Sequence, residues 1–264
     1  MSERKKYLSM IGVICLLVVL SILSVREPAK AITADVKAGV EQVEKEQTPL
    51  PTPSENENET QSEENKKVVY LTFDDGPSTV TGEILTLLDK YNAKATFFML
   101  GPNIKKHPSE VKQMAAQGHG LGLHSMTHRK DKFYASRYSS LNEMNMARQT
   151  LEETTGTSTL LIRTPYGSVP YMKKSYRETV EEWGYVMWDW NIDSRDWKYQ
   201  DSRYIQAVIN QLQIVSKGER PPVILLHERK TTLQHLEKLL IYLHKSGYRM
   251  VPITKDLQPV QFKI

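Results

Sequence analysis

Cysteine is almost absent from this chain of 264 residues, which contains a single one, Cys15. Cys15 lies within an apolar run near the N-terminus, so the remainder of the chain has no thiol. This absence excludes disulfide bonds, a cysteine nucleophile and a cysteine-rich zinc site there. Basic residues are scarce in residues 32–65, which carry nine acidic and two basic side chains, Pro51, Pro53 and many Ser, Thr, Asn and Gln. Such a composition predicts a disordered acidic linker.

An uncharged apolar run of 19 residues, residues 7–25, follows a basic cluster at positions 4–6. As a helix it would be about 28 Å long at about 1.5 Å per residue, which is enough to cross a bilayer. We therefore predict an uncleaved transmembrane anchor in residues 1–31. Residues 29–31 resemble a cleavage site, so a removed signal peptide is the alternative. The basic flank predicts a cytoplasmic N-terminus and an extracytoplasmic remainder, held at the cell membrane or secreted after cleavage.

Residues 66–264 are predicted to form the folded domain. They carry a net charge of +8, because residues 1–31 contribute +3 and the linker −7 to the total of +4. Strands are expected from short apolar runs at 68–73, 95–100, 120–124, 160–163, 185–190, 223–227 and 249–252. Helices are expected at 81–91, at 202–215, after a capping box at Ser140 and Glu143, and along Leu233, Leu236, Leu240 and Leu243. Seven strands separated by helices predict a parallel α/β fold, either a doubly wound sheet or a barrel.

Polar residues suited to chemistry follow several of the expected strands. Asp74 and Asp75 come directly after the first strand, and His124 ends the third, with His128 close behind it. Asp and His side chains bind zinc and similar divalent ions, and three protein ligands with a vacant position are typical of a catalytic metal. The carboxyl ends of parallel strands meet at one rim, where α/β barrels build active sites. We therefore expect a metal that activates water, held by one carboxylate and both imidazoles, with a second carboxylate left free.

A cation and a sharp turn are expected at the same rim. Arg163 follows the fourth strand, where its permanent charge would orient Asp74 and keep it ionised; a structural salt bridge is the alternative. Pro165 and Gly167 predict a turn that would aim the backbone N–H of Tyr166 inward, as an oxyanion donor requires. Ordinary turn chemistry explains the same residues.

Aromatic residues are concentrated in the segment 188–197, which contains three tryptophans and three carboxylates. Because indole faces stack on the C–H faces of pyranose rings, this segment predicts a sugar-binding rim, with one or two of its tryptophans in the core. His227 ends the wholly apolar run 223–226. A lone histidine there is usually a core residue, but the nearby carboxylates favour an acid whose pKa is tuned by its surroundings.

Five motifs occur along the chain: T-F-D-D-G-P at 72–77, H-S-x-x-H at 124–128, R-x-P-Y-G at 163–167, D-S-x-D-W at 193–197 and L-L-H at 225–227. Together they resemble the polysaccharide deacetylases of carbohydrate esterase family four, the NodB homology domain, over residues 66–256. The resemblance implies a distorted seven-stranded β/α barrel and a metal-dependent hydrolase that removes N-acetyl groups from N-acetylglucosamine units. The predicted anchor, linker and basic domain favour peptidoglycan as the substrate. Chitooligosaccharides, N-acetylmuramic acid and acetylated xylan are alternatives.

The resemblance also implies roles for individual residues. Asp75, His124 and His128 match the metal ligands, and the implied cofactor is one divalent ion, zinc first and then cobalt, nickel or manganese. Asp74 matches the catalytic base and His227 the general acid. Arg163 matches the residue that holds the base, and Asp196 matches the carboxylate that pairs with the acid. Two matches lie beside the substrate: the backbone N–H of Tyr166 faces the oxyanion, and Trp197 lines the substrate groove.

Other interpretations fit part of the pattern. A non-haem iron oxygenase uses the same ligand set of two His and one carboxylate, but the spare Asp74 and the acid His227 favour hydrolysis. A carbohydrate-binding domain without activity would retain glycans and release no acetate. A glycosidase with a carboxylate pair leaves both metal-site histidines unexplained. Glu228 stands where many relatives have Asp, a conservative departure. We expect a monomer that binds a polysaccharide and the membrane but no nucleic acid.

Overall fold

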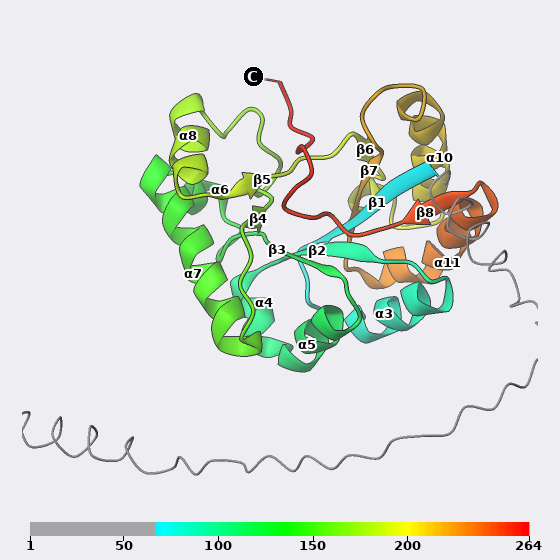
Figure 1. Ribbon diagram of the computed structural model, residues 1–264, viewed down its shortest axis with the longest axis horizontal. Helices are drawn as coiled ribbons and strands as arrows, with labels where there is room; N and C mark the ends of the chain where they lie inside the picture. Colours follow the sequence, from blue (N-terminus) through cyan, green and yellow to red (C-terminus); the bar gives the residue numbers. More distant parts are fainter. Residues whose placement is uncertain (1–66, 264) are drawn as a thin grey trace, which may run out of the picture. The chain divides into compact units, whose positions relative to one another are not determined.

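The computed structural model describes residues 67–263, and the predicted anchor and linker lie outside them. No helix in this part of the chain is long and apolar enough to cross a bilayer. Parallel strands alternate with helices, except that β6 follows β5 with no helix between them (Figure 1). The strands of residues 67–263 are β1 (Lys67–Asp74), β2 (Ala95–Met99), β3 (Gly120–Leu123), β4 (Leu161–Ile162), β5 (Val186–Met187), β6 (Ile192–Asp193), β7 (Val223–His227) and β8 (Tyr248–Met250).

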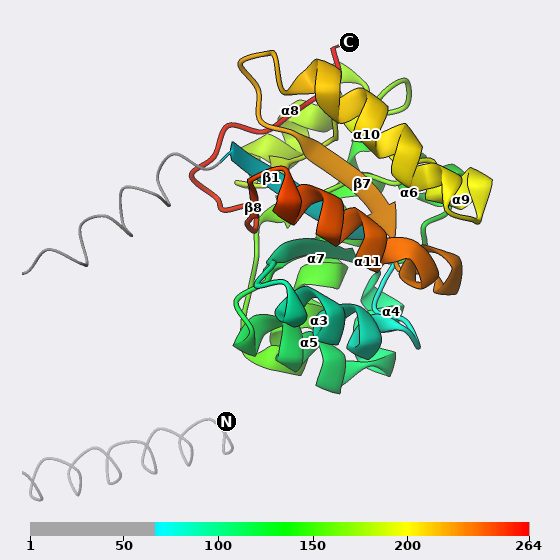
Figure 2. The ribbon, with the colours of Figure 1, turned by 90° about the vertical axis from the view of Figure 1, so that its right-hand side faces the viewer.

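The helices cover the outer face of the sheet, and Figure 2 shows α10 and α11 next to β7. Their apolar positions recur at helical spacing, as in α10, where Ile205, Val208 and Leu212 are buried. The helices of the described residues are α3 (Thr81–Lys90), α4 (Gly101–Lys106), α5 (Pro108–Ala116), α6 (Lys130–Phe133), α7 (Arg137–Thr155), α8 (Lys174–Glu182), α9 (Asp196–Tyr199), α10 (Arg203–Val215) and α11 (Lys230–Lys245).

The sheet has the order β5-β4-β3-β2-β1-β7-β6, and β8 pairs with the first residues of β1. All pairs are parallel, and Leu71 at the centre faces Ala95 on one side and Ile224 on the other. The sheet is a curled half-barrel, which confirms the predicted α/β class, and no ladder among the described residues joins its end strands. The sequence pattern predicts seven strands where residues 67–263 form eight, because β6 is too short to give an apolar run.

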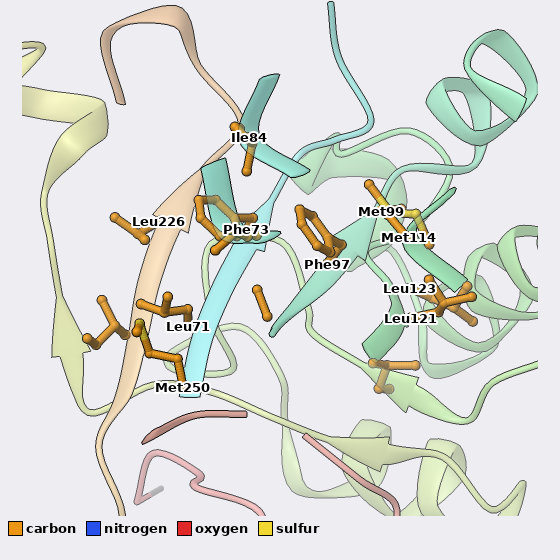
Figure 3. Close-up of a cluster of buried hydrophobic side chains, with 14 of the residues drawn as sticks. Leu71, Phe73, Ile84, Phe97, Met99, Met114, Leu121, Leu123, Leu226 and Met250 are labelled. Atoms are coloured by element: carbon orange, nitrogen blue, oxygen red, sulfur yellow. The ribbon is translucent and has the colours of Figure 1, made fainter. Parts of the chain in front are cut away.

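The core lies between the strands and the helices that cover them. Figure 3 shows Phe73 of β1, Phe97 of β2 and Leu226 of β7 within one cluster, with Ile84 from α3 beside them. The rings of Phe73 and Phe97 stack with centroids 5.3 Å apart. Each such side chain stabilises the fold by about 1.5–3 kcal/mol when fully buried. This packing fixes the strands that carry polar residues at their carboxyl ends.

The start of α7 corrects one prediction. The sequence pattern places a capping box at Ser140 and Glu143, but α7 begins at Arg137, and the capping box is formed by Ser136 and Ser139. The Ser140 hydroxyl instead donates to the carbonyl of Phe133. The capping prediction was wrong because the helix begins one turn earlier, so that Ser140 and Glu143 lie inside it. Glu143 is thereby free for a different contact.

Candidate active site

Two strand ends bring the three predicted metal ligands together. Asp75 follows β1, while His124 follows β3 and His128 lies in the loop beyond it. The Nε2 atoms of His124 and His128 lie 3.7 and 3.4 Å from Asp75 Oδ1. One ligand atom from each residue falls within 4.8 Å of the others. Such a cluster of one oxygen and two nitrogen donors has the composition and spacing of a divalent-metal site.

The surroundings of these side chains fit a bound cation. Asp75 Oδ1 is buried and has no hydrogen-bond partner among the described residues, so it lacks the donor that a buried carboxylate needs. The Nδ1 of His124 lies 2.7 Å from the carbonyl oxygen of Arg163, which directs Nε2 to the cluster. Burial, together with the charge of His124, lowers the pKa of His128 and favours the neutral imidazole that binds metal. The donor set therefore fits one divalent ion.

The backbone is strained at this cluster. Asp75, His128 and Tyr166 have positive φ angles of 72°, 52° and 64°, although none of them is glycine. Non-glycine residues adopt this left-handed region at a cost and are concentrated at functional sites. Two of the three are predicted ligands, and the third supplies the predicted oxyanion donor. The local conformations thus aim these groups at one place.

Glu143 of α7 holds the loop that carries His128, and sequence reasoning missed this contact. Its Oε2 accepts hydrogen bonds from the backbone N–H groups of Met126 and Thr127, at 3.1 and 2.9 Å. Its Oε1 accepts from the Thr127 hydroxyl at 2.8 Å. A buried carboxylate on a helix thereby fixes the loop between the two histidine ligands. The sequence did contain a signal for this contact, because Glu143 is an acidic residue on the otherwise buried face of α7. The capping-box pattern led us to assign Glu143 to the helix cap instead.

Arg163 and Asp74 form a buried ion pair behind the metal cluster. Arg163 is fully buried and donates from Nη1 to Asp74 Oδ1 at 2.8 Å and to the Thr72 hydroxyl at 2.7 Å. Its other nitrogens donate to the carbonyl oxygens of Trp188 and Asp189. Asp74 Oδ2 lies 3.8 Å from His124 Nε2, next to the ligands. One oxygen of Asp74 is thus held by a cation, and the other faces the metal cluster.

His227 and Asp196 form a second pair across the site. His227 Nδ1 lies 2.8 Å from Asp196 Oδ1, and the Thr232 hydroxyl donates to Asp196 Oδ2 at 2.6 Å. Burial opposes the charged form of His227, but the hydrogen bond and charge of Asp196 outweigh it and raise the pKa of His227. Burial also opposes ionisation of Asp196, and the hydrogen bonds from His227 and Thr232 outweigh it and hold its pKa below the usual range. The pair therefore favours an imidazolium beside a carboxylate.

These groups surround a cavity of about 380 Å³, a size within the range of small-molecule sites. Seven of the nine predicted site residues line it, and Arg163 and Asp196 lie directly behind Asp74 and His227. The Trp197 side chain is 45% exposed, as a sugar-binding face requires, whereas Trp188 is fully buried in the core. The other lining residues are Gly167, Trp190, Asp193, Leu225 and Arg229. Trp190 and Asp193 belong to the segment 188–197 that was predicted as a sugar-binding rim, whereas Arg229 was not predicted.

The backbone N–H of Tyr166 donates no hydrogen bond to any described residue, and Tyr166 lines the cavity. Its ring packs on His128 with centroids 4.7 Å apart, and its hydroxyl donates to the His128 carbonyl oxygen at 3.1 Å. The turn after Arg163 thus leaves an unused donor beside the metal cluster. A larger hollow of about 920 Å³ lies at the other end of the strands and is lined by no predicted site residue.

Glu228 lies just outside the cavity, beneath the loop after Asp75. Its carboxylate accepts from the Thr81 hydroxyl and packs against Gly76 so closely that no side chain fits there. Burial raises the pKa of Glu228 to about 8. The Glu228 side chain therefore occupies space that Gly76 leaves open.

Comparisons with known proteins agree with this geometry. Residues 61–188 match the model of a family described as polysaccharide deacetylase. The putative polysaccharide deacetylase YheN of Bacillus subtilis is 45% identical over 196 residues, which cover 74% of this chain and 70% of that protein. A peptidoglycan-N-acetylglucosamine deacetylase of Bacillus cereus is 36% identical over 245 residues, 90% of this chain and 88% of that protein.

The fold agrees with a solved structure as well. The crystal structure of the polysaccharide deacetylase Bc1974 from Bacillus cereus superposes with a TM-score of 0.66 at 38% sequence identity. The match covers 75% of this chain and 97% of that chain. The curled parallel sheet is therefore shared over nearly the whole of that protein.

Proposed function

This chain belongs to the polysaccharide deacetylase family, and we propose that it hydrolyses the N-acetyl groups of N-acetylglucosamine units in a cell-wall polysaccharide, most directly peptidoglycan. One observation carries the proposal. The cluster of Asp75, His124 and His128 shares a single cavity with the free oxygen of Asp74 and with His227. Amide hydrolysis requires an electrophilic centre, a base and an acid within reach of one carbonyl group, and this cavity offers all three.

The metal site is part of the proposal. A divalent ion, zinc first and cobalt, nickel or manganese as alternatives, would be held by Asp75, His124 and His128. When bound, it would supply a Lewis acid that polarises the acetyl carbonyl and lowers the pKa of water. The order of preference among these ions rests on the donor set, because carboxylate and imidazole suit zinc.

Asp74 acts as the base in the proposed reaction. Its Oδ1 is held by Arg163, so Oδ2 is the oxygen that accepts a proton from the attacking water. The water oxygen then bonds to the acetyl carbon. The backbone N–H of Tyr166 stabilises the negative charge that develops on the carbonyl oxygen. The base and the oxyanion donor both line the same cavity, so they can act on one acetyl group.

His227 acts as the acid. Asp196 holds its Nδ1, so the proton delivered to the departing nitrogen comes from Nε2. The C–N bond breaks as that proton arrives, and the products are acetate and the free amine of a glucosamine unit. Trp197, exposed at the cavity mouth, would stack on a sugar ring and hold the acetyl group over the base.

Location and substrate are linked in the proposal. The apolar run 7–25 and the acidic linker would tether the domain outside the cell membrane, and its net charge would hold it near an anionic wall. The substrate named for the Bacillus cereus relative supports peptidoglycan as the first choice. Chitooligosaccharides, N-acetylmuramic acid residues and acetylated xylan are the alternative substrates.

The test is to incubate the purified full chain with intact peptidoglycan and, separately, with chitohexaose, and to locate free amines by mass spectrometry. We expect free amines on the glucosamine units of peptidoglycan, and none with Asp74→Asn, which keeps the size of the side chain but removes the base. A wild-type chain that retains glycan without releasing acetate would instead be a binding domain. Acetate release from the muramic acid units alone would identify N-acetylmuramic acid as the substrate and leave the proposed mechanism unchanged.

A further inference from the structure

The last described segment of the chain closes the open side of the curled sheet. In Figure 1 this red segment passes between β5 and β6, which no ladder joins within residues 67–263. The backbone N–H of Asp189 donates to the carbonyl oxygen of Val260 at 2.7 Å, and the Gln261 side-chain amide donates to that of Met187 at 3.0 Å. Residues 259–263, called the strap below, are therefore hydrogen-bonded to β5 and to the segment that follows it.

One buried carboxylate joins the strap to the turn after Arg163. Asp189 is fully buried, and its Oδ1 accepts from the backbone N–H of Ser168 at 2.9 Å. Its Oδ2 accepts from the Ser168 hydroxyl at 2.5 Å and from the backbone N–H of Phe262 at 2.8 Å. Since a buried carboxylate is costly without such donors, the turn and the strap are held to each other.

The Phe262 ring contacts two walls of the active-site cavity. It meets the Trp190 ring edge to face, with centroids 5.0 Å apart. A Cβ built at Gly167 would lie 3.0 Å from the Phe262 ring and 2.9 Å from Trp190, so both rings pack directly on the glycine backbone. Gly167 and Trp190 line the cavity, and Gly167 follows Tyr166. Phe262 itself is not among the cavity-lining residues.

We propose that Phe262 is a positioning residue of the active site, which holds Gly167 and Trp190 in place and thereby aims the backbone N–H of Tyr166. The proposal rests on the proposed function, in which that N–H stabilises the oxyanion. Misplacement of a catalytic group by about 1 Å can cost up to about 100-fold in rate. None of the recorded contacts of the strap reaches Asp75, His124 or His128 directly. Any effect on the metal ligands would pass through the contacts of Tyr166 with His128, so metal binding should change much less than kcat.

The first test compares Phe262→Ala, Phe262→Tyr and Lys263→Ala in the full chain. Lys263 is exposed at the end of the strap and serves as the matched control. We expect Phe262→Ala to lower kcat about tenfold, within the range for a displaced catalytic group, while its affinity for Zn²⁺ stays within twofold of wild type. Phe262→Tyr keeps the ring and should retain kcat within twofold, as should Lys263→Ala. An unchanged kcat in Phe262→Ala, or an equal loss of metal affinity, would overturn the proposal.

A second measurement does not depend on activity. Amide hydrogen exchange by mass spectrometry should show faster exchange in residues 164–170 of Phe262→Ala and unchanged exchange in residues 124–128. If the alanine variant does not fold, Phe262→Leu should show the same local effect. Equal exchange in residues 164–170 of wild type and variant would overturn the proposal. The two proposals can fail separately. If the wild-type chain releases no acetate but residues 164–170 still exchange faster in Phe262→Ala than in wild type, the proposed function is contradicted and the positioning contact is supported.

Discussion

At the scale of single residues, the site depends on a few buried charges whose partners are fixed. Asp74 is 3% exposed and Arg163 is fully buried, so each needs the other to offset its loss of hydration. The same pair leaves one oxygen of Asp74 free to accept a proton. Structural and chemical roles therefore coincide in one ion pair.

Removal of Arg163 should affect both stability and rate. We expect Arg163→Met to lower the free energy of unfolding by about 3 kcal/mol, because it leaves the charge of Asp74 buried without a partner. Urea denaturation measures this change. Arg163→Lys is the control, since it keeps the cation but not the planar fork that also reaches Thr72 and Asp189. It should be more stable than the methionine variant and still less active than wild type, and equal stability of all three proteins would contradict the assignment.

The pH dependence of the rate should reveal the pair of His227 and Asp196. The acid must be protonated and Asp74 ionised, so kcat/KM should follow a bell-shaped curve. Because Asp196 raises the pKa of His227, the proton stays on to higher pH than in a free imidazole. In Asp196→Asn that support is lost while burial remains, so the alkaline limb should move to lower pH. An alkaline limb in the same position would show that His227 is not the acid.

The structure brings the nine residues that the sequence singled out together at one cavity, because each belongs to a short motif that ends or follows a strand, and their catalytic roles stay predictions. The sequence did not predict the contacts that hold them. Glu143 was assigned to a helix cap, and the role of Asp189 depends on Phe262, which lies more than 70 positions further along the chain. Contacts between distant segments leave no local pattern, so they could be found only in the structure.

At the scale of elements, α7 matters to the metal site through a single side chain. Glu143 joins the helix to the loop between His124 and His128 by accepting hydrogen bonds from three donor groups of that loop. A helix in the outer layer therefore helps to set the distance between two ligands. The strands position ligands without such a contact, because the buried apolar residues of β1 and β3 themselves fix where Asp75 and His124 lie.

Loss of this connection should weaken metal binding. We expect Glu143→Ala to reduce the affinity for Zn²⁺ by about 10- to 100-fold, the range typical of groups that orient metal ligands. Calorimetric titration of the metal-free protein measures the change. Glu153→Ala, on the exposed face of the same helix, is the matched control and should bind as wild type does. Equal affinities in the two variants would show that the loop holds its own shape.

The predicted elements were confirmed where apolar runs are long and were incomplete where they are short. β1, β2 and β7 match the expected strands closely. β6 has two residues and was missed, and only two residues of the expected run 185–190 pair as β5. Side chains from distant segments complete the hydrogen bonds of these short strands: Gln261 donates to Met187 of β5, and Gln211 of α10 bonds to the backbone of Asp193 in β6. No local sequence pattern can specify such contacts.

At the scale of the whole described domain, the parallel sheet gathers the functional groups at one end. β1, β3 and β7 all point their carboxyl ends to the same cavity, and the curl brings residues from across the sheet to within a few ångströms. The hollow at the opposite end lacks this set of side chains. Sequence analysis predicted the rim from the parallel alternation, but the closure of the sheet by residues 259–263 could not be predicted.

The dependence of the proposed reaction on a divalent ion is tested most directly by acetate release from peptidoglycan, measured on the same purified chain before and after exhaustive chelation. We expect acetate release to fall to background after chelation and to return on addition of one equivalent of Zn²⁺. Asp75→Ala should remain at background under both conditions. Undiminished acetate release from the fully chelated wild-type chain would contradict a metal site built from Asp75, His124 and His128.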